Sequence, residues 1–70
     1  MEMINVQSSN LKSVGYDDNQ SSLYVEFKHG GKYKYFNVDR NIYDNLLVAD
    51  SKGKFFDQNI KKAGYKYSKV

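Results

Sequence analysis

The sequence has no cysteine and a single histidine, His29, among its 70 residues. A disulfide framework is therefore excluded, and the ligands of a structural zinc site are missing. Domains of this length bury only about 60% of the surface that the unfolded chain exposes, so they often depend on such cross-links. We therefore expect the seven tyrosines and four phenylalanines to supply much of the packing in a single domain spanning residues 1–70.

Long apolar runs are also absent. No stretch approaches the ~20 apolar residues that a membrane-spanning helix requires. The beginning of the chain, Met-Glu-Met-Ile-Asn, lacks the basic and apolar regions of a signal peptide. The sequence thus predicts a soluble, cytoplasmic protein that does not contact a membrane.

No motif for catalysis or cofactor binding is present. The sequence has no cysteine nucleophile, no glycine pattern of a phosphate-binding loop and no cluster of metal ligands. His29 and the acidic pair Asp17–Asp18 lie in predicted turns, where a structural role is the common one. The segment Ser51–Lys54 either joins two helices or binds an anion at the start of the second helix. We predict no catalytic, cofactor-binding or metal-binding residue, and no enzymatic activity.

Alternating apolar and polar side chains predict antiparallel strands. The alternation is clearest over residues 22–28, where Leu23, Val25 and Phe27 share one face. His29-Gly30-Gly31 supplies a hairpin turn, because adjacent glycines adopt the positive φ angles of tight hairpins. The strand that follows, over residues 32–38, directs Tyr33 and Tyr35 to one face and Lys32, Lys34 and Phe36 to the other.

Two earlier segments are also predicted to be strands. Over residues 11–16, Leu11 is out of phase with Val14 and Tyr16, and a bulge near Ser13 or Gly15 would bring the three together. Residues 3–6 would form an edge strand with Ile4 and Val6 on its inner face.

The apolar period changes to that of a helix after Val38. Asp39 suits the N-cap of a helix over about residues 40–49. Lys52 or Gly53 is expected to end this region, and a second helix is predicted over residues 54–62. Gly64 would then occupy the position just past the end of that helix. Residues 65–67, Tyr-Lys-Tyr, are predicted to be extended.

Strands followed by helices are typical of an α+β domain. We expect an antiparallel β-meander of three to four strands followed by two short α-helices packed on one face. The predicted core consists of Val14, Leu23, Val25, Phe27, Tyr35, Ile42, Leu46, Leu47, Phe56 and Ile60.

The net charge of +3 is distributed unevenly along the chain. Residues 1–31 contain two lysines and four acidic residues, and residues 32–51 are balanced. Residues 52–70 contain six lysines and a single acidic residue, Asp57. Such a basic segment is typical of a nucleic-acid contact or a membrane-surface contact, and equally of a solvated tail.

The order and spacing of several short segments resemble the KTSC domain, which occurs at the carboxyl end of some lysyl-tRNA synthetases and as small stand-alone bacterial and phage proteins. The matching segments are Val6–Leu11, Val14–Asp17, Leu23–Phe27, Gly31–Tyr35, Val38, Tyr43, Leu46, Ala49–Phe56 and Asn59–Lys61. The family usually has a proline where this chain has Asp39, and both residue types suit a helix start. The resemblance implies no catalytic residue, and it suggests RNA binding through the link to a tRNA synthetase.

Two functions are compatible with these features. The first is an accessory module that binds RNA or another single-stranded nucleic acid through strand aromatics and the basic carboxyl-terminal quarter. Its predicted binding residues are Tyr24, Lys32, Lys34, Phe36, Lys52, Lys54, Lys61, Lys62 and Lys66. Tyr33 and Tyr35 are instead expected to pack beneath the helices. The alternative is a protein–protein interaction module that binds a partner or a second copy through an exposed aromatic sheet face or the edge strand.

Overall fold

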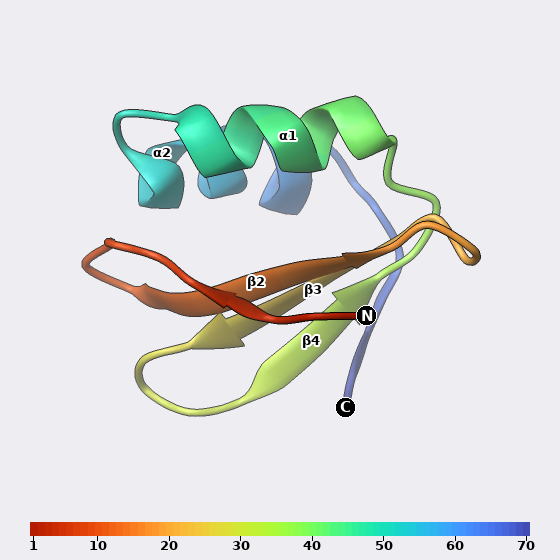
Figure 1. Cartoon of the computed structure of the whole chain (residues 1–70), viewed down its shortest axis with the longest axis horizontal. Helices are drawn as coiled ribbons and strands as arrows, with labels where there is room; N and C mark the ends of the chain where they lie inside the picture. The colour runs from red at the N-terminus through yellow and green to blue at the C-terminus, as the bar shows by residue number, and fades with distance from the viewer.

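The computed structural model describes residues 1–70 as one antiparallel sheet with a layer of helices on one face (Figure 1). The five strands lie in chain order, with β1 and β5 at the edges. Their bounds are β1 Ile4–Asn5, β2 Leu11–Asp17, β3 Ser22–Phe27, β4 Lys32–Tyr35 and β5 Tyr67–Lys69. The predicted α+β meander is confirmed. The fifth strand was not predicted, because β5 is formed by pairing with β4 and three residues give too short a pattern to identify.

The pairing of β2 with β3 contains the bulge that the sequence predicts. The register shifts between Leu11 and Ser13, and beyond it Val14 lies opposite Val25. The extra residue rotates the start of β2, so that Leu11 and Val14 are both completely buried. The expected hairpin is also present, since Gly30 and Gly31 have φ angles of 106° and 93° between β3 and β4.

The edge strand β1 differs from the expectation. It is only two residues long, and Ile4 remains 43% exposed although inward burial was predicted. Ile4 pairs with Val14 at the margin of the sheet, where no further strand covers it. Val6, just past the strand, is half-buried and packs against the core as expected.

The helical layer consists of α1 (Arg40–Val48), α2 (Lys52–Phe56) and a π-helical turn, η1 (Asp57–Lys61). Asp39 occupies the N-cap of α1 without a side-chain capping bond. The expected interruption at Lys52 or Gly53 is wrong, because both residues lie within α2. The Ser51 hydroxyl accepts the Lys54 N–H at 3.4 Å and starts that helix earlier. The longest helix, α1, has 9 residues, well short of the ~20 apolar residues of a membrane-spanning helix.

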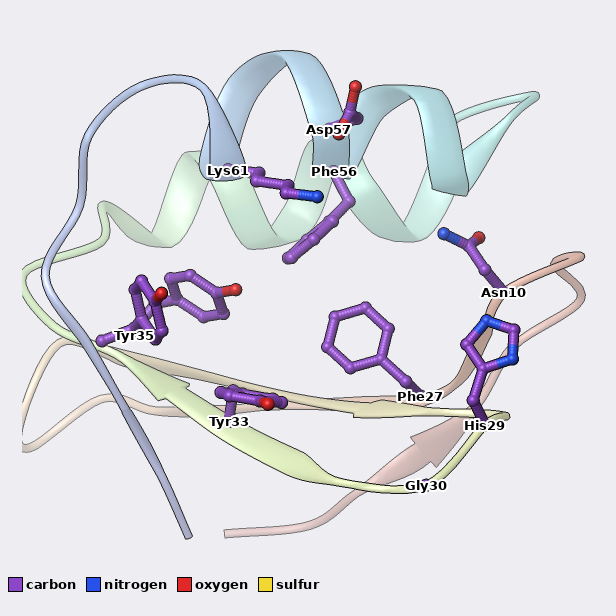
Figure 2. Close-up of a pocket in the computed structure, with 10 residues that line it drawn as sticks. Asn10, Phe27, His29, Gly30, Tyr33, Tyr35, Phe56, Asp57 and Lys61 are labelled. Atoms are coloured by element: carbon purple, nitrogen blue, oxygen red, sulfur yellow. The ribbon is translucent and has the colours of Figure 1, made fainter.

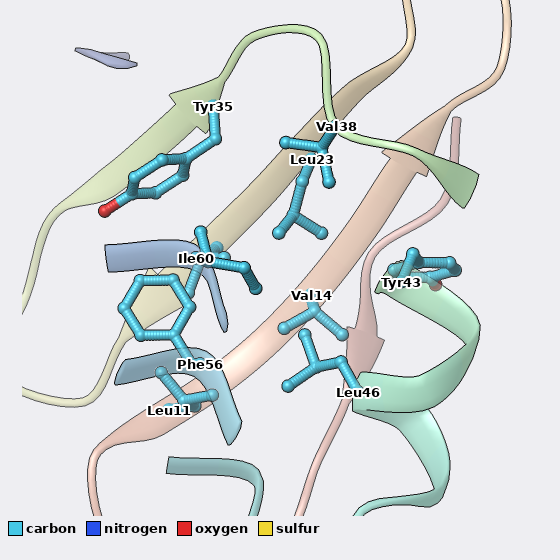
Figure 3. Close-up of a cluster of buried hydrophobic side chains, with 10 residues drawn as sticks. Leu11, Val14, Leu23, Tyr35, Val38, Tyr43, Leu46, Phe56 and Ile60 are labelled. Carbon is cyan, nitrogen blue, oxygen red and sulfur yellow. The ribbon is translucent and has the colours of Figure 1, made fainter. Parts of the chain in front are cut away.

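Ten buried apolar side chains between sheet and helices form one core (Figure 3). Seven predicted members are buried, namely Val14, Leu23, Val25, Tyr35, Leu46, Phe56 and Ile60. The predicted burial of Phe27, Ile42 and Leu47 is wrong, since all three are only partly buried at the margin of the core. Leu11, Val38 and Tyr43 are buried instead. The stripe of α1 that faces the sheet is centred on Tyr43 and Leu46, so the flanking Ile42 and Leu47 remain at its border.

Candidate functional site

The sheet face opposite the helices, here called the outer face, gathers an aromatic and basic group of side chains. Tyr24 on β3 pairs with Lys34 on β4, which places both on this face. The Lys34 ammonium lies 5.7 Å from the centre of the Tyr24 ring and 5.1 Å from the centre of the Phe36 ring. Both rings are half-buried. The ammonium is therefore held between two aromatic rings, as in a cation–π contact.

Two further lysines extend the outer face toward the β5 edge. Lys32 pairs with Glu26. It lies two residues before Lys34 on β4 and therefore on the same face of the sheet. The Phe36 N–H donates to the Lys66 carbonyl at 2.9 Å, which continues the β4–β5 pairing by one residue. This register places Lys66 beside Phe36. The outer face is thus defined by Tyr24, Lys32, Lys34, Phe36 and Lys66.

The other four predicted nucleic-acid residues lie in the helical layer, on the opposite side of the sheet. Lys52 donates to the Ala49 carbonyl at 3.1 Å, at the end of α1. Lys54 is exposed on α2. Lys62 pairs with Asp57 at 3.6 Å, and Lys61 belongs to η1. The structure therefore divides the nine predicted residues between two layers and does not assemble them into one surface.

The acidic turn has a structural partner. Arg40 Nη1 lies 2.7 Å from Asp18 Oδ2, and Arg40 Nε lies 3.2 Å from Asp44 Oδ1. Asp17 accepts the N–H of Asn19 at 3.0 Å. No group of three or more His, Asp or Glu side chains that could hold a metal ion is present.

A second surface, which the sequence did not predict, is an aromatic groove between the sheet and the α2–η1 segment (Figure 2). Its cavity has a volume of about 460 Å³. Five rings line it in a closed cycle, and the centres of consecutive rings lie 5.3–5.9 Å apart. The order of the rings is Phe27, Tyr33, Tyr67, Tyr35 and Phe56. These five residues define the aromatic groove.

The rings of this cycle differ in how deeply they are buried. Phe56 and Tyr35 are 2% and 6% exposed and form the floor, whereas Tyr67 on the edge strand β5 is 61% exposed. Burial raises the pKa of the Tyr35 hydroxyl, and the neighbouring Tyr67 and Tyr33 raise it further. Tyr35 therefore presents a neutral hydroxyl at physiological pH.

The polar ends of the groove come from different elements. Asn10 and the exposed His29 lie at the end near the β3–β4 turn, and Asp57 and Lys61 of η1 lie above the rings (Figure 2). In an α-helix Asp57 would pair with residue 61, four positions on. In the π turn the Lys62 N–H donates to the Asp57 carbonyl at 3.0 Å, and the Lys62 ammonium pairs with the Asp57 carboxylate. Lys61 is thereby directed over the groove.

Sequence reasoning missed the groove for an identifiable reason. Tyr33 and Tyr35 are in phase with Val25, which indicated a core role, and Tyr35 is indeed buried. The sequence predicts only an extended segment at residues 65–67, and nothing in its pattern places Tyr67 beside Tyr33 and Tyr35, as the β4–β5 pairing does. The one available signal was the recurrence of Tyr-Lys-Tyr at residues 33–35 and 65–67.

Comparisons with known proteins agree with this fold. An uncharacterized protein of Stutzerimonas stutzeri is 41% identical over 70 residues, which span 100% of this chain and 99% of that protein. The crystal structure of a KTSC domain protein from Yersinia pestis matches with a TM-score of 0.92 at 35% identity, over 99% of this chain and 96% of that chain. A lysine–tRNA ligase of Nostoc punctiforme is 32% identical over 59 residues, which span 84% of this chain and 10% of the ligase.

The sequence model of the KTSC domain matches residues 7–67, which is nearly the whole chain. Together with the close structural match to a KTSC domain protein, this shows that the protein belongs to the KTSC domain family.

Proposed function

We propose that this protein is an accessory module that binds single-stranded RNA through its outer face, and that it acts by binding rather than by catalysis. The observation that supports this proposal is the Lys34 ammonium held 5.7 Å and 5.1 Å from the centres of the Tyr24 and Phe36 rings on the sheet face that no helix covers. Single-stranded nucleic acids are commonly bound by aromatic rings on a sheet beside basic side chains.

The charges and the relatives favour the same partner class. Lys32, Lys34 and Lys66 lie along the β4–β5 side of the outer face, where they would contact successive phosphates. A similar segment forms part of proteins named lysine–tRNA ligase, in which an RNA is a named substrate. We propose that this binding takes place in the cytoplasm.

Fluorescence anisotropy with labelled single-stranded RNA tests the proposal. We expect micromolar or tighter binding at low salt that weakens as salt rises, with a logarithmic slope of about −2 for three phosphate contacts on a single strand. Lys34→Gln should weaken binding and reduce the slope by about 0.7. Tyr24→Ala should weaken binding by about 1–3 kcal/mol.

Lys54→Gln is the matched control, because it removes the same charge from the exposed face of α2. It should leave RNA binding nearly unchanged. Equal losses in Lys34→Gln and Lys54→Gln would show that the outer face is not the binding surface. Absence of RNA binding even at low salt would reject the proposal altogether.

A second candidate is a protein–protein interaction module, favoured by one observation. The edge strand β1 leaves Ile4 43% exposed and one side of its backbone without a partner strand. A partner strand or a second copy would extend the sheet there. Such binding would depend little on salt, which distinguishes it from phosphate contacts.

A further inference from the structure

The aromatic groove lies on the helix side of the sheet, apart from the outer face, and its composition points to a ligand of its own. Its volume of about 460 Å³ falls within the range of small-molecule sites, roughly 300–1,000 Å³. Tyr67 forms an exposed wall, whereas Phe56 and Tyr35 form a buried floor. A flat group entering from solvent would therefore meet the face of an accessible ring and an apolar base.

The charges at the mouth of the groove are positive. Asp57 pairs with Lys62 at 3.6 Å. None of the four salt bridges in the structure includes Lys61. Lys69 pairs with Tyr33 across β4 and β5 and so shares its face. A Cβ atom at Gly31 would lie 3.9 Å from Lys69 Cε and 3.3 Å from the Tyr33 ring, which places this lysine beside the groove.

These features select among the ligands that aromatic sites bind. A quaternary ammonium ion suits a ring of aromatic faces, but Lys61 and Lys69 would repel it. A neutral aromatic side chain would fill the groove and leave both lysines without a partner. A planar base that bears a phosphate satisfies both parts, since aromatic rings stack on bases and lysines bind phosphate.

We infer that the aromatic groove is a nucleotide site, in which one base lies against Tyr67 and Tyr33 and its phosphate contacts Lys61, with Lys69 beside the groove adding positive charge. The ligand is either a free mononucleotide or the terminal residue of an RNA strand, which share this chemistry. The inference goes beyond the proposed outer-face binding, because it concerns the opposite side of the sheet.

Titration of the isotope-labelled protein with adenosine 5′-monophosphate, followed by nuclear magnetic resonance, tests this site. The signals of Lys61, Tyr33 and Tyr67 should shift and saturate. Adenosine and ribose 5-phosphate should each bind about tenfold or more weakly, because each lacks one of the two recognised parts. Shifts confined to other residues would overturn the assignment. So would an affinity for ribose 5-phosphate equal to that for adenosine 5′-monophosphate.

Three variants sharpen the test. Tyr67→Ala and Lys61→Gln should each weaken binding of the monophosphate about tenfold. Lys54→Gln, the matched control, removes an equal charge from an exposed residue of α2 that does not line the groove, and should change the affinity less than twofold. Lys61→Gln decides the question if Tyr67→Ala fails to fold, because Lys61 is exposed. Unchanged affinity in Lys61→Gln would overturn the inference.

Two further arms separate the ligand sources and the two surfaces. Shifts at Lys61 and Tyr67 with a 5′-phosphorylated RNA oligomer but not with the monophosphate would identify the ligand as a strand end. Shifts with the monophosphate but not with the oligomer would identify it as a free nucleotide. Either result supports the site, whereas no shift with both ligands overturns it. Lys34→Gln on the outer face should leave monophosphate binding intact. A tenfold loss in that variant would place the nucleotide on the outer face and reject the groove, so the two proposals fail separately.

Discussion

The Lys52 ammonium donates to the backbone carbonyl of Ala49 at 3.1 Å and closes the turn between α1 and α2. Ala49 is the C-cap residue of α1, where carbonyl groups lack helical partners and a nearby positive charge is favourable. Lys52 is partly buried, whereas Lys54, two residues on, is exposed and makes no such bond. The two lysines therefore differ in role despite their similar sequence setting.

Lys52→Gln should lower the free energy of unfolding by about 1 kcal/mol, because the Ala49 carbonyl loses a charged donor at a helix end. Lys54→Gln should change it by less than about 0.5 kcal/mol. Urea unfolding of the two variants followed by circular dichroism measures the difference. Equal stabilities would show that the Lys52 bond contributes nothing. A charge-removal variant meant to leave folding intact should accordingly spare Lys52.

The packing of α1 makes a second prediction, for the neighbouring residues Leu46 and Leu47. Leu46 is completely buried, whereas Leu47 lies at the border of the core. Leu46→Ala should cost about 2–5 kcal/mol of stability through lost burial and a cavity. Leu47→Ala should cost about 1 kcal/mol. The same urea measurement applies, and a larger loss in Leu47→Ala would contradict the orientation of α1 in which Leu46, and not Leu47, faces the core.

The raised pKa of Tyr35 makes a third prediction. Because burial and the neighbouring Tyr67 and Tyr33 raise the pKa of Tyr35 in the folded state, the unfolded chain releases this proton first as the pH rises. The contribution of Tyr35 to stability is present in full below the unfolded pKa of about 10 and is lost as the pH rises through the folded pKa.

Tyr35→Phe removes this titration and keeps the buried ring. The melting temperature of the wild type should therefore fall more steeply between about pH 9 and pH 11 than that of the variant. Some alkaline loss should remain in Tyr35→Phe, because burial also raises the pKa of Tyr43. Thermal unfolding at a series of pH values measures both slopes. If the melting temperature falls with pH equally in the wild type and in Tyr35→Phe, the ionisation of Tyr35 does not contribute to the loss of stability at alkaline pH.

Much of the local structure could be predicted because it depends on neighbours along the chain. The alternation of Leu23, Val25 and Phe27 identified β3, and the phase of Leu11 against Val14 indicated the bulge. Adjacent glycines identified the hairpin, and the change of period identified α1. The charge pattern likewise marked the basic carboxyl-terminal quarter. Each of these inferences needs only the geometry of one element.

The candidate sites depended on contacts between distant segments, which no periodicity contains. The pairing of Tyr67 with Tyr35 joins the end of the chain to its middle, and only this pairing completes the cycle of five rings. The π turn decides that Lys62, and not Lys61, faces Asp57. Sequence patterning determined the strands, the first helix and the rings available for packing. Tertiary structure alone decided which rings enclose a groove and which lysines share a surface, because those relationships arise from the pairing of β4 with β5 and the placement of η1 above the sheet.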